Sequence, residues 1–572
     1  MTRATHPPMR RLVALFAFYA FALAAVLVRL GVLQVSRASA YQTEAIRQRV
    51  DTVALPAWRG RILDRSGEPL AISVPARDVY ADPQYVRDAW NTAKRLASVL
   101  ALKVPALVRT LRSHATFVYV ARQVPMSVAA RIDRMNLPGI DMLPVSARSY
   151  PAGPLAPQLL GFVDIDGIGR SGLELQYEPE LAGRPGSKTF EHDLDGRPIV
   201  GGIHVETPSV PGEDVETTID RDFQYQVQSA LRDAVAANHA AGGMVIVMNP
   251  HTGDVYAMAT YPWFDPNDPG ASPMGTWRNR PITDLYEPGS TNKVITAAAA
   301  VQEHAVPLDR RLLVPWTMRV GPYTIHDSHE HAPEWMTLGD IVAQSSNIGA
   351  AMIADRLGAH TMARYLAAFG LGRPTGVAFP NESAGITLPL SQWTSATLAT
   401  AAYGQGLAVT PLQMISVFAT IANGGEWVRP RLVRGFVDDD GFHRAPYSPT
   451  RRVVSAGTAR VVTEMLSYVV RDGTGTAARI PGYQVAGKTG TARIPMPGGG
   501  YYTDRSIASF MGFLPAGNPE VVIAAILDRP ATVYGGIAAA PLFQTVARSA
   551  IERFGIAPAD PVGLPPHALP AS

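Results

Sequence analysis

Apolar residues gather first in one long run near the N-terminus. The stretch from Leu12 to Val28 carries no charge, and after Arg29 the apolar pattern continues to Val35. At a rise of about 1.5 Å per residue, a helix of this length crosses a hydrocarbon core about 30 Å thick. Arg29 can extend its charge to the interface if it lies near the outer end. The pattern therefore predicts a transmembrane anchor at residues 12–35, in contact with the lipid bilayer.

The charges that flank this run predict its orientation. Three arginines precede it, and Arg37 alone closely follows it. Because positive residues stay on the cytoplasmic side, residues 1–11 are expected to form a cytoplasmic tail. The alternative is a cleaved signal peptide with its site at residues 38–40. The run exceeds the usual length of about 7–15 residues, and Arg29 and Arg37 separate it from that site, so we favour a retained anchor.

Residues 36–216 contain short strand-like runs that glycine and proline interrupt, as in RGRILDRSGEPLAIS. Such breakers mark turns, so we expect an irregular α+β domain here rather than long helices. The short strand-like runs give way to a helical pattern at TTIDRDFQYQVQSALRDAVAANHA, where Thr218 and Asp220 can cap a helix from about Arg221 to Asn238. A second domain is therefore expected over residues 217–556.

The second domain is predicted to be α+β, with helices flanking a central antiparallel sheet. GMVIVM and DVYAMATYP are typical of two strands joined by a turn. IASFMGFLP and EVVIAAILD predict two more strands, and a last helix is expected from about Pro541 to Phe554. A helix followed by hairpins favours helices packed on one sheet. The proline-rich segment 557–572 is expected to be disordered.

Composition excludes several kinds of function. The chain has 572 residues and no cysteine, which rules out disulfides, thiolate metal sites and a cysteine nucleophile. Its 51 lysines and arginines nearly balance 48 aspartates and glutamates, and the net charge of +3 is too small for a nucleic-acid footprint. We therefore expect no nucleic-acid partner.

The stretch EPGSTNKVITAAAA offers the first candidate chemistry. Ser290 follows a Pro-Gly turn near the start of a helix, and Lys293 lies three residues further on the same face. A partly desolvated lysine loses its charge and can accept the serine proton, while backbone N–H groups at the helix start can stabilise an oxyanion. Alone, the pair is more easily explained as a helix cap and a surface lysine.

Two further motifs favour the catalytic interpretation of Ser290 and Lys293. AQSSNIGAA places Ser345 and Asn347 at a junction inside a helical stretch. There Ser345 can shuttle a proton, and Asn347 can hold a substrate amide and orient Lys293.

The third motif, VAGKTGTA, lies on a strand-like run. Lys488 adds positive charge, and the hydroxyls of Thr489 and Thr491 can bind a substrate carboxylate. Gly490 lets an acyl donor approach the strand backbone.

Serine-x-x-lysine, serine-x-asparagine and lysine-threonine-glycine, in this order, form the motif set of penicillin-recognising acyl-transfer enzymes. The chain resembles a class B penicillin-binding protein over nearly its whole length, to about residue 555. RGRILDRSGEPLA, RSYPAG and SGLELQYEPELAGRPG resemble the N-terminal pedestal of that family. The motif EPGS resembles the septal, cell-division branch (FtsI-type, penicillin-binding protein 3) more than the elongation branch, whose pattern is PPGS.

This resemblance implies a peptidoglycan D,D-transpeptidase that needs no cofactor and no metal. Ser290 would attack the penultimate D-alanine carbonyl of a peptidoglycan stem pentapeptide, and an amine of a neighbouring stem would then take the acyl group. Backbone N–H groups of Ser290 and Thr491 would form the oxyanion hole, and β-lactam antibiotics would acylate the same serine. The septal branch also implies a membrane glycosyltransferase and divisome proteins as partners, and an inner-membrane location with the catalytic domain in the periplasm.

Three alternatives share the motif set: an inactive scaffold, a β-lactam sensor and an elongation-type transpeptidase. The intact motif residues argue against a scaffold. A sensor needs further membrane helices and a cytoplasmic effector, whereas this chain has one anchor and a tail of about ten residues. Motif variants alone separate the septal and the elongation types.

Two segments qualify this interpretation. Asn292 stands where the family usually has phenylalanine, which puts in question the packing beneath Lys293 and the affinity for β-lactams. The cluster HDSHEH holds His326, His329 and His331, which could be metal ligands. The resemblance implies a loop there that requires no metal, so we expect no metal site.

Overall fold

The computed structural model describes residues 9–47, 49–193, 199–532 and 534–558. The chain divides into two compact units. One consists of Met1–Trp58 and Gly183–Pro211, and the other of Arg59–Ala182 and Gly212–Ser572. The main chain therefore leaves the second unit after Ala182 and returns to it at Gly212.

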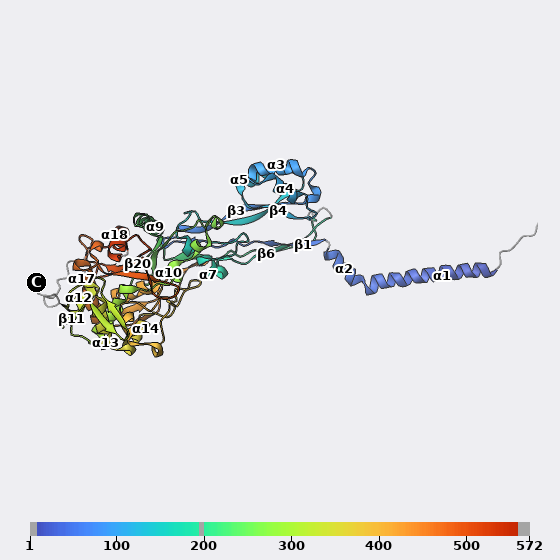
Figure 1. Cartoon of the computed structure of the whole chain (residues 1–572). Coiled ribbons are helices and arrows are strands. Elements are labelled where there is room, and N and C mark those ends of the chain that lie inside the picture. Colours follow the sequence, from blue (N-terminus) through green and yellow to red (C-terminus); the bar gives the residue numbers. More distant parts are fainter. Residues whose placement is uncertain (1–8, 48, 194–198, 533, 559–572) are drawn as a thin grey trace, which may run out of the picture. The chain divides into compact units, whose positions relative to one another are not determined.

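The first unit contains the N-terminal helix and a small antiparallel sheet (Figure 1). α1 (Met9–Gly31) continues into a π-helical turn, η1 (Val32–Ser36), before α2 (Ala38–Arg47). Met9–Val35 has a mean hydropathy of 2.3 and is long and apolar enough to cross a membrane. The predicted apolar helix is thus present, and it begins three residues earlier than expected. The sheet has the order β1-β6-β7 and consists of β1 (Val50–Leu55), β6 (Gly186–Glu191) and β7 (His204–Thr207).

The second unit begins with the predicted irregular α+β part, built on a seven-stranded sheet. Six strands follow the order β17-β16-β8-β2-β3-β4, and β5 pairs with β3. These strands are β2 (Ile62–Leu63), β3 (Pro69–Ala81), β4 (Val118–Pro125), β5 (Ile140–Ser149), β8 (Asp214–Thr217), β16 (Val433–Asp438) and β17 (Gly441–Arg444). The helices of this part are α3 (Ala89–Leu100), α4 (Val104–Leu111), α5 (Met126–Asp133), α6 (Pro157–Leu160), α7 (Gly172–Gln176) and α8 (Glu178–Leu181).

A buried ion cluster joins two distant segments of this part. Glu174 is fully buried, and its carboxylate accepts hydrogen bonds from Arg59 Nε at 2.7 Å and from Arg148 Nε at 2.7 Å. The Tyr150 hydroxyl donates to the same carboxylate at 3.2 Å. A buried carboxylate is tolerated when it is paired and hydrogen-bonded in this way. The cluster therefore fixes the segment that begins RGRILD against the segment SGLELQ.

The central sheet of the second unit contains the strands that the sequence predicted. Its order is β10-β9-β21-β20-β19, and every neighbouring pair is antiparallel. The strands are β9 (Gly242–Met248), β10 (Val255–Tyr261), β19 (Ala486–Pro495), β20 (Tyr501–Leu514) and β21 (Val521–Asp528). All side chains of β9 and β21 are buried, as expected for strands covered on both faces.

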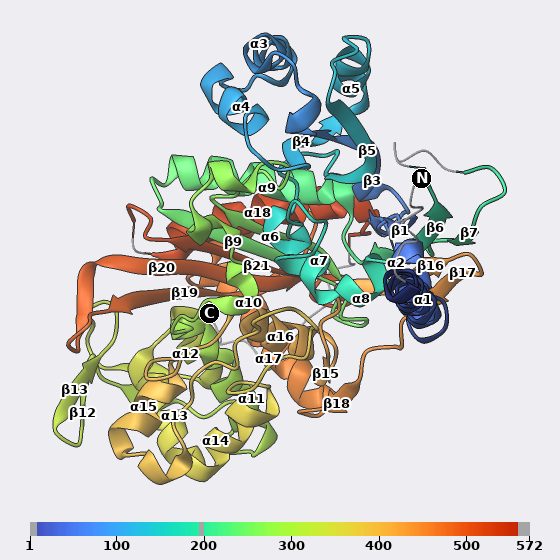
Figure 2. The same cartoon turned by 90° about the vertical axis from the view of Figure 1, so that its right-hand side faces the viewer.

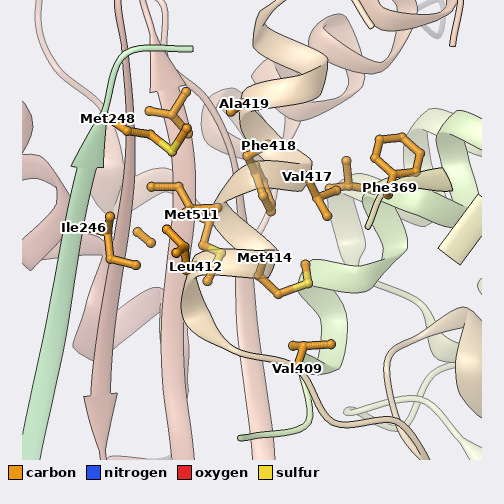
Figure 3. Packing of buried hydrophobic residues seen from close by; sticks show 14 of the residues in the cluster. Ile246, Met248, Phe369, Val409, Leu412, Met414, Val417, Phe418, Ala419 and Met511 are labelled. Atoms are coloured by element: carbon orange, nitrogen blue, oxygen red, sulfur yellow. The ribbon is translucent and has the colours of Figure 1, made fainter. Parts of the chain in front are cut away.

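Helices cover both faces of this sheet (Figure 2). α9 (Arg221–Ala237) and α18 (Gly535–Phe554) pack on one face with Val245 and Val247. The alternate residues Ile246 and Met248 point to the other face, where they contact the cluster that contains α16 (Pro411–Ala422). Figure 3 shows Leu412, Met414 and Phe418 of α16 between this sheet and Phe369. The α+β fold with helices flanking an antiparallel sheet is therefore confirmed.

The second unit contains further helices and short strands, of which α10, α11, α17 and β15 contact α16. The helices are α10 (Arg280–Thr283), α11 (Lys293–Gln302), α12 (Leu338–Gln344), α13 (Asn347–Leu357), α14 (Ala359–Ala368), α15 (Ser395–Ala402) and α17 (Ala456–Asp472). The short strands are β11 (Leu312–Val314), β12 (Thr317–Val320), β13 (Tyr323–His326), β14 (Glu334–Met336), β15 (Glu426–Val428) and β18 (Thr450–Arg452).

Two boundary predictions can be compared with the structure. The helix predicted from Arg221 ends at Ala237, and the Asp220 side chain caps it by accepting from Phe223 N at 3.1 Å. The last helix was predicted to begin at Pro541, which is wrong, because α18 begins at Gly535 and contains Pro541 in its interior. Of the tail expected to be disordered, residues 559–572 lie outside the described residues.

Candidate active site

Ser290 lies in a 3₁₀ turn, η5 (Gly289–Asn292), that leads directly into α11. Gly289 has φ +56°, and a Cβ there would lie 2.9 Å from the Thr491 carbonyl oxygen. Its N–H donates to the Gly404 carbonyl at 3.0 Å. Glycine is therefore required at this position both by the backbone angle and by the close approach of β19. The turn is fixed between two other segments, which sets the direction of the Ser290 hydroxyl.

Lys293 is 1% exposed, and its amine is surrounded by oxygen atoms. Nζ lies 3.0 Å from Ser290 Oγ, 2.8 Å from Asn347 Oδ1 and 2.5 Å from the Ser345 carbonyl oxygen. The amide and carbonyl oxygens can act only as acceptors, so they take two N–H bonds of a neutral amine. The lone pair of that amine then remains available to the hydroxyl proton of Ser290.

The charge state of Lys293 supports this arrangement. Burial lowers the pKa of Lys293 from 10.5 to about 7, and the negative charge of Asp327 opposes part of this effect. An ordinary lysine is almost fully protonated near neutral pH, whereas this lysine is divided between its charged and neutral forms. Lys293 can therefore accept a proton from Ser290 near neutral pH.

Ser345 and Asn347 lie at a break between two helices, as the sequence predicted. α12 ends at Gln344, Ser345 adopts a left-handed conformation with φ +63°, and α13 begins at Asn347. The Ser346 side chain caps α13 by accepting from Gly349 N at 2.8 Å. Ser345 Oγ lies 3.2 Å from Lys293 Nζ. The break thus directs both Ser345 and Asn347 at the lysine.

Asp327 holds this break in place, and the sequence did not single it out. The carboxylate is 6% exposed and accepts from Ser346 Oγ at 2.7 Å and from Ile348 N at 3.0 Å. It also accepts from Asn347 N, and His331 Nε2 lies 3.1 Å away. A carboxylate at a helix N-terminus is stabilised by the free N–H groups there. Asp327 therefore positions the junction that contacts Lys293.

The histidine cluster contributes to this anchor. His326 provides the backbone carbonyl that accepts from Asn347 Nδ2 at 3.1 Å. His331 contacts Asp327, whereas the His329 ring lies 5.6 Å from the Tyr534 ring. Within the described residues, the histidine and acidic side chains form no group able to hold a metal ion.

Lys488 lies on β19, at the edge of the central sheet, and is fully buried. Burial and the nearby charge of Lys293 lower the pKa of Lys488 well below its usual range. Its amine lies 3.2 Å from Thr489 Oγ1, which in turn contacts Thr474 Oγ1 at 2.8 Å. The Thr491 hydroxyl accepts from Gly535 N at 3.2 Å. Two amines that share one buried region disfavour each other's charge, and an anionic group that binds beside them favours the protonated form of Lys488.

Gly490 allows β19 to contact the Ser290 turn. A Cβ at this position would lie 2.3 Å from Ser509 Oγ and 2.9 Å from Thr291 Cγ2. A side chain here would therefore force the strand and the turn apart. The three predicted motifs thus meet in one cluster, and each lies on the kind of element that the sequence predicted.

Asn292 is fully buried beneath this cluster. Its Nδ2 donates to the Ala401 carbonyl at 2.7 Å, while its Oδ1 is buried without a hydrogen-bond partner among the described residues. Asn292 therefore fixes the start of α11 to the end of α15 by a polar contact.

The sequence matches two domain families that are known from other proteins. Residues 243–548 match the sequence model of the penicillin-binding protein transpeptidase domain, and residues 54–217 match that of the penicillin-binding protein dimerisation domain. The chain is 36% identical to penicillin-binding protein PbpB of Mycobacterium tuberculosis, over 94% of this chain and 84% of that protein. It is 33% identical to peptidoglycan D,D-transpeptidase FtsI of Escherichia coli, over 94% of this chain and 90% of that protein.

The fold also matches solved structures. The crystal structure of penicillin-binding protein 3 from M. tuberculosis, complexed with ampicillin, aligns with a TM-score of 0.73 and 33% identity, and covers 91% of this chain and all of that chain. A peptidoglycan synthetase from Bifidobacterium adolescentis aligns with a TM-score of 0.73 and 27% identity, over 90% of this chain and 98% of that chain.

Proposed function

Because the chain belongs to the penicillin-binding proteins that combine a dimerisation domain with a transpeptidase domain, and is a peptidoglycan D,D-transpeptidase of septal cell-wall synthesis, we propose a role for each motif residue in its reaction. Ser290 is the nucleophile and Lys293 the base. The observation that carries this assignment is the 3.0 Å contact between Lys293 Nζ and Ser290 Oγ, with two acceptor oxygens holding the other side of the amine.

In the acylation step, Ser290 Oγ attacks the penultimate D-alanine carbonyl of a stem pentapeptide while its proton passes to Lys293. The C–N bond to the terminal D-alanine then breaks, and the amine that leaves takes up a proton that Lys293 returns through Ser345. The Ser345 hydroxyl, 3.2 Å from Nζ, is close enough for this relay. The product is an ester between Ser290 and the shortened stem.

In the second step, an amine of a neighbouring stem attacks this ester. Lys293, again neutral, accepts the proton from the attacking amine through Ser345, and Ser290 Oγ is released and takes that proton back. The new C–N bond is the cross-link. Asn347 holds an amide of the donor stem in this step and keeps Lys293 in place.

The strand with Lys488, Thr489, Gly490 and Thr491 binds the donor. Protonated Lys488 and the two threonine hydroxyls are proposed to bind the terminal carboxylate of the stem, whose negative charge favours that protonated form, and Gly490 admits the acyl donor beside the strand. We assign the oxyanion hole to the backbone N–H groups of Ser290 and Thr491. The close approach of Gly289 to the Thr491 carbonyl supports this assignment, because it brings the two backbones together.

Penicillin-binding protein 3 of M. tuberculosis has been solved in complex with ampicillin and with aztreonam, and we propose that β-lactams acylate Ser290 of this chain. The ring carbonyl takes the position of the stem carbonyl, and the opened ring remains attached as an ester that no acceptor amine removes.

The described residues include one helix able to span a membrane, and the protein is a single-pass membrane protein. We propose that residues 12–35 cross the inner membrane with residues 1–11 in the cytoplasm, and that a pedestal (36–216) and a transpeptidase domain (217–556) lie in the periplasm before the tail (557–572). The excess of arginine before the helix supports this orientation. A membrane glycosyltransferase and divisome proteins are the proposed partners.

A transpeptidation assay tests the assignment. The full chain in detergent is given a donor peptide that ends in D-Ala-D-Ala together with a D-amino acid as acceptor, and mass spectrometry follows D-alanine release and the exchanged product. We expect Ser290→Ala to abolish both products. Ser345→Ala should slow both steps while the Ser290 ester still forms. Full exchange by Ser290→Ala would contradict the proposal.

A further inference from the structure

A cavity lies away from Ser290, at the end of α14 and beside β15 and β18. Its volume is about 230 Å³, and its walls include Gly370, Arg373, Trp427 and Arg451. It shares no lining residue with the cluster around Lys293. The transpeptidase reaction therefore gives this cavity no role.

Arg451 lines the cavity, and its guanidinium is incompletely satisfied. Its Nη1 donates to the Ala368 carbonyl, and its Cζ lies 4.3 Å from the centre of the Trp427 ring. Its Nη2 is buried and has no hydrogen-bond partner among the described residues. A Cβ built on Gly370 would lie 3.4 Å from that Nη2, so Gly370 lies directly beside the guanidinium. A buried N–H donor without a partner is unfavourable, which indicates a missing acceptor.

A second cation lies next to the first. Arg373 lines the same cavity and is exposed to solvent. Burial, together with the positive charge of Arg373, lowers the pKa of Arg451 to about 10. Two like charges beside one cavity repel each other unless an anion lies between them.

The nearby acidic side chains are engaged elsewhere. The Glu382 carboxylate accepts from Thr375 N, Thr375 Oγ1 and Gly376 N. Glu426 pairs with Arg452 at 3.7 Å, and Arg452 is the neighbour of Arg451 on β18. In the described part of the chain, neither Arg373 nor Arg451 forms an ion pair within 4.0 Å. No acid of the described chain therefore neutralises this pair of arginines.

We propose that this cavity binds a small oxyanion, a phosphate or carboxylate group, between the guanidinium groups of Arg451 and Arg373. The planar fork of arginine matches both groups and binds them with two parallel hydrogen bonds. A volume of about 230 Å³ is smaller than the roughly 300–1,000 Å³ of sites for drug-sized molecules. The cavity therefore takes a single anionic group, either free or at the end of a larger ligand that enters past the exposed Arg373.

The bound anion would accept hydrogen bonds from the guanidinium of Arg451 and would remove the repulsion between the two arginines. It would thereby join the segment after α14 to the β15–β18 pair. The site thus stabilises the folded protein to an extent that depends on the anion concentration in solution.

Thermal unfolding of the full chain in detergent tests this inference. Inorganic phosphate, and in a separate series succinate, replaces chloride at constant ionic strength. We expect a saturable rise in Tm with one or both anions, and the series that responds identifies the phosphate or the carboxylate class. In Arg373→Gln and in Arg451→Gln the apparent Kd should be at least tenfold weaker. Without either anion, Arg373→Gln should unfold at a higher temperature than the wild type, because it removes the repulsion.

Arg452→Gln is the matched control, since it removes one arginine from the opposite face of the same strand and should keep the wild-type response. If Arg451→Gln fails to fold, the exposed Arg373→Gln still decides the question, and its unchanged penicillin acylation reports an intact fold. No saturable response to either anion, or equal responses of Arg373→Gln and Arg452→Gln, would overturn the proposal.

Discussion

Asp327→Asn tests how the junction of Ser345 and Asn347 is held. The substitution keeps the size of the side chain but removes its charge. The carboxylate accepts from Ser346 Oγ, Asn347 N and Ile348 N, and it is almost fully buried. A hydrogen bond to a charged group contributes about 1.5–3 kcal/mol, roughly twice a neutral one. An amide keeps some of these bonds, so we expect a loss of about 2–3 kcal/mol at the junction.

This loss has a kinetic consequence. If this loss appears in the transition state, the second-order rate constant of acylation by penicillin falls about 30- to 140-fold, because about 1.4 kcal/mol corresponds to a factor of ten. Stopped-flow measurement with a chromogenic or fluorescent penicillin gives this constant directly. Glu330→Gln is the matched control, because it removes the same charge from an exposed position in the same loop.

The pH dependence separates positioning from general destabilisation. The charge of Asp327 raises the pKa of Lys293, whereas burial lowers it to about 7. Without that charge, the pKa of Lys293 should fall below about 7, because burial is then unopposed. The acid limb of the acylation profile should then move to lower pH while the plateau falls. An acylation constant within threefold of the wild type, or a limb that moves to higher pH, would refute this reasoning.

Four other changes have defined outcomes. In the wild type, acylation should rise with pH through about 7, because Lys293 must be neutral, and a flat profile between pH 5 and 9 would contradict its role as the base. Gly490→Ala should lower the acylation constant by about 100-fold or more, because its Cβ would lie 2.3 Å from Ser509 Oγ and displace the strand from the Ser290 turn. Glu174→Gln should destabilise the fold by about 3–5 kcal/mol in thermal unfolding, since it removes the charge that pairs with buried Arg148 and one of the two carboxylates that pair with Arg59. Asn292→Ala should cost about 1–2 kcal/mol of stability, because the buried Ala401 carbonyl loses its donor, and an unchanged Tm would show that this contact is dispensable.

The sequence predicted the parts of the site that depend on local geometry. Ser290 and Lys293 are three residues apart on one helix start, so their contact follows from helical spacing. Lys488 lies on a strand that its own apolar neighbours predict. The order of the three motifs indicated that these elements meet, although no local rule states how closely.

Asp327 could not be predicted in the same way. It is 18 residues before Ser345, beyond a short strand and the whole of α12, and its role appears when the loop is folded against the start of α13. The histidines around it could be considered as metal ligands, whereas the aspartate among them belongs to none of the three motifs. The early start of α18 was missed for a related reason, because Pro541 is typical of a first turn but here lies within the helix. Packing of α18 on the sheet outweighs the local cost of that proline.

The central claim is that Ser290 is the residue that becomes acylated. Intact-protein mass spectrometry of the full chain after exposure to a penicillin, with Ser290→Ala measured beside it, tests this claim most directly. The account predicts one stable covalent adduct of the mass of the drug on the wild type, located by peptide mapping at Ser290, and no adduct on the variant. An adduct that persists on folded Ser290→Ala, or a folded wild type that forms none, would contradict it.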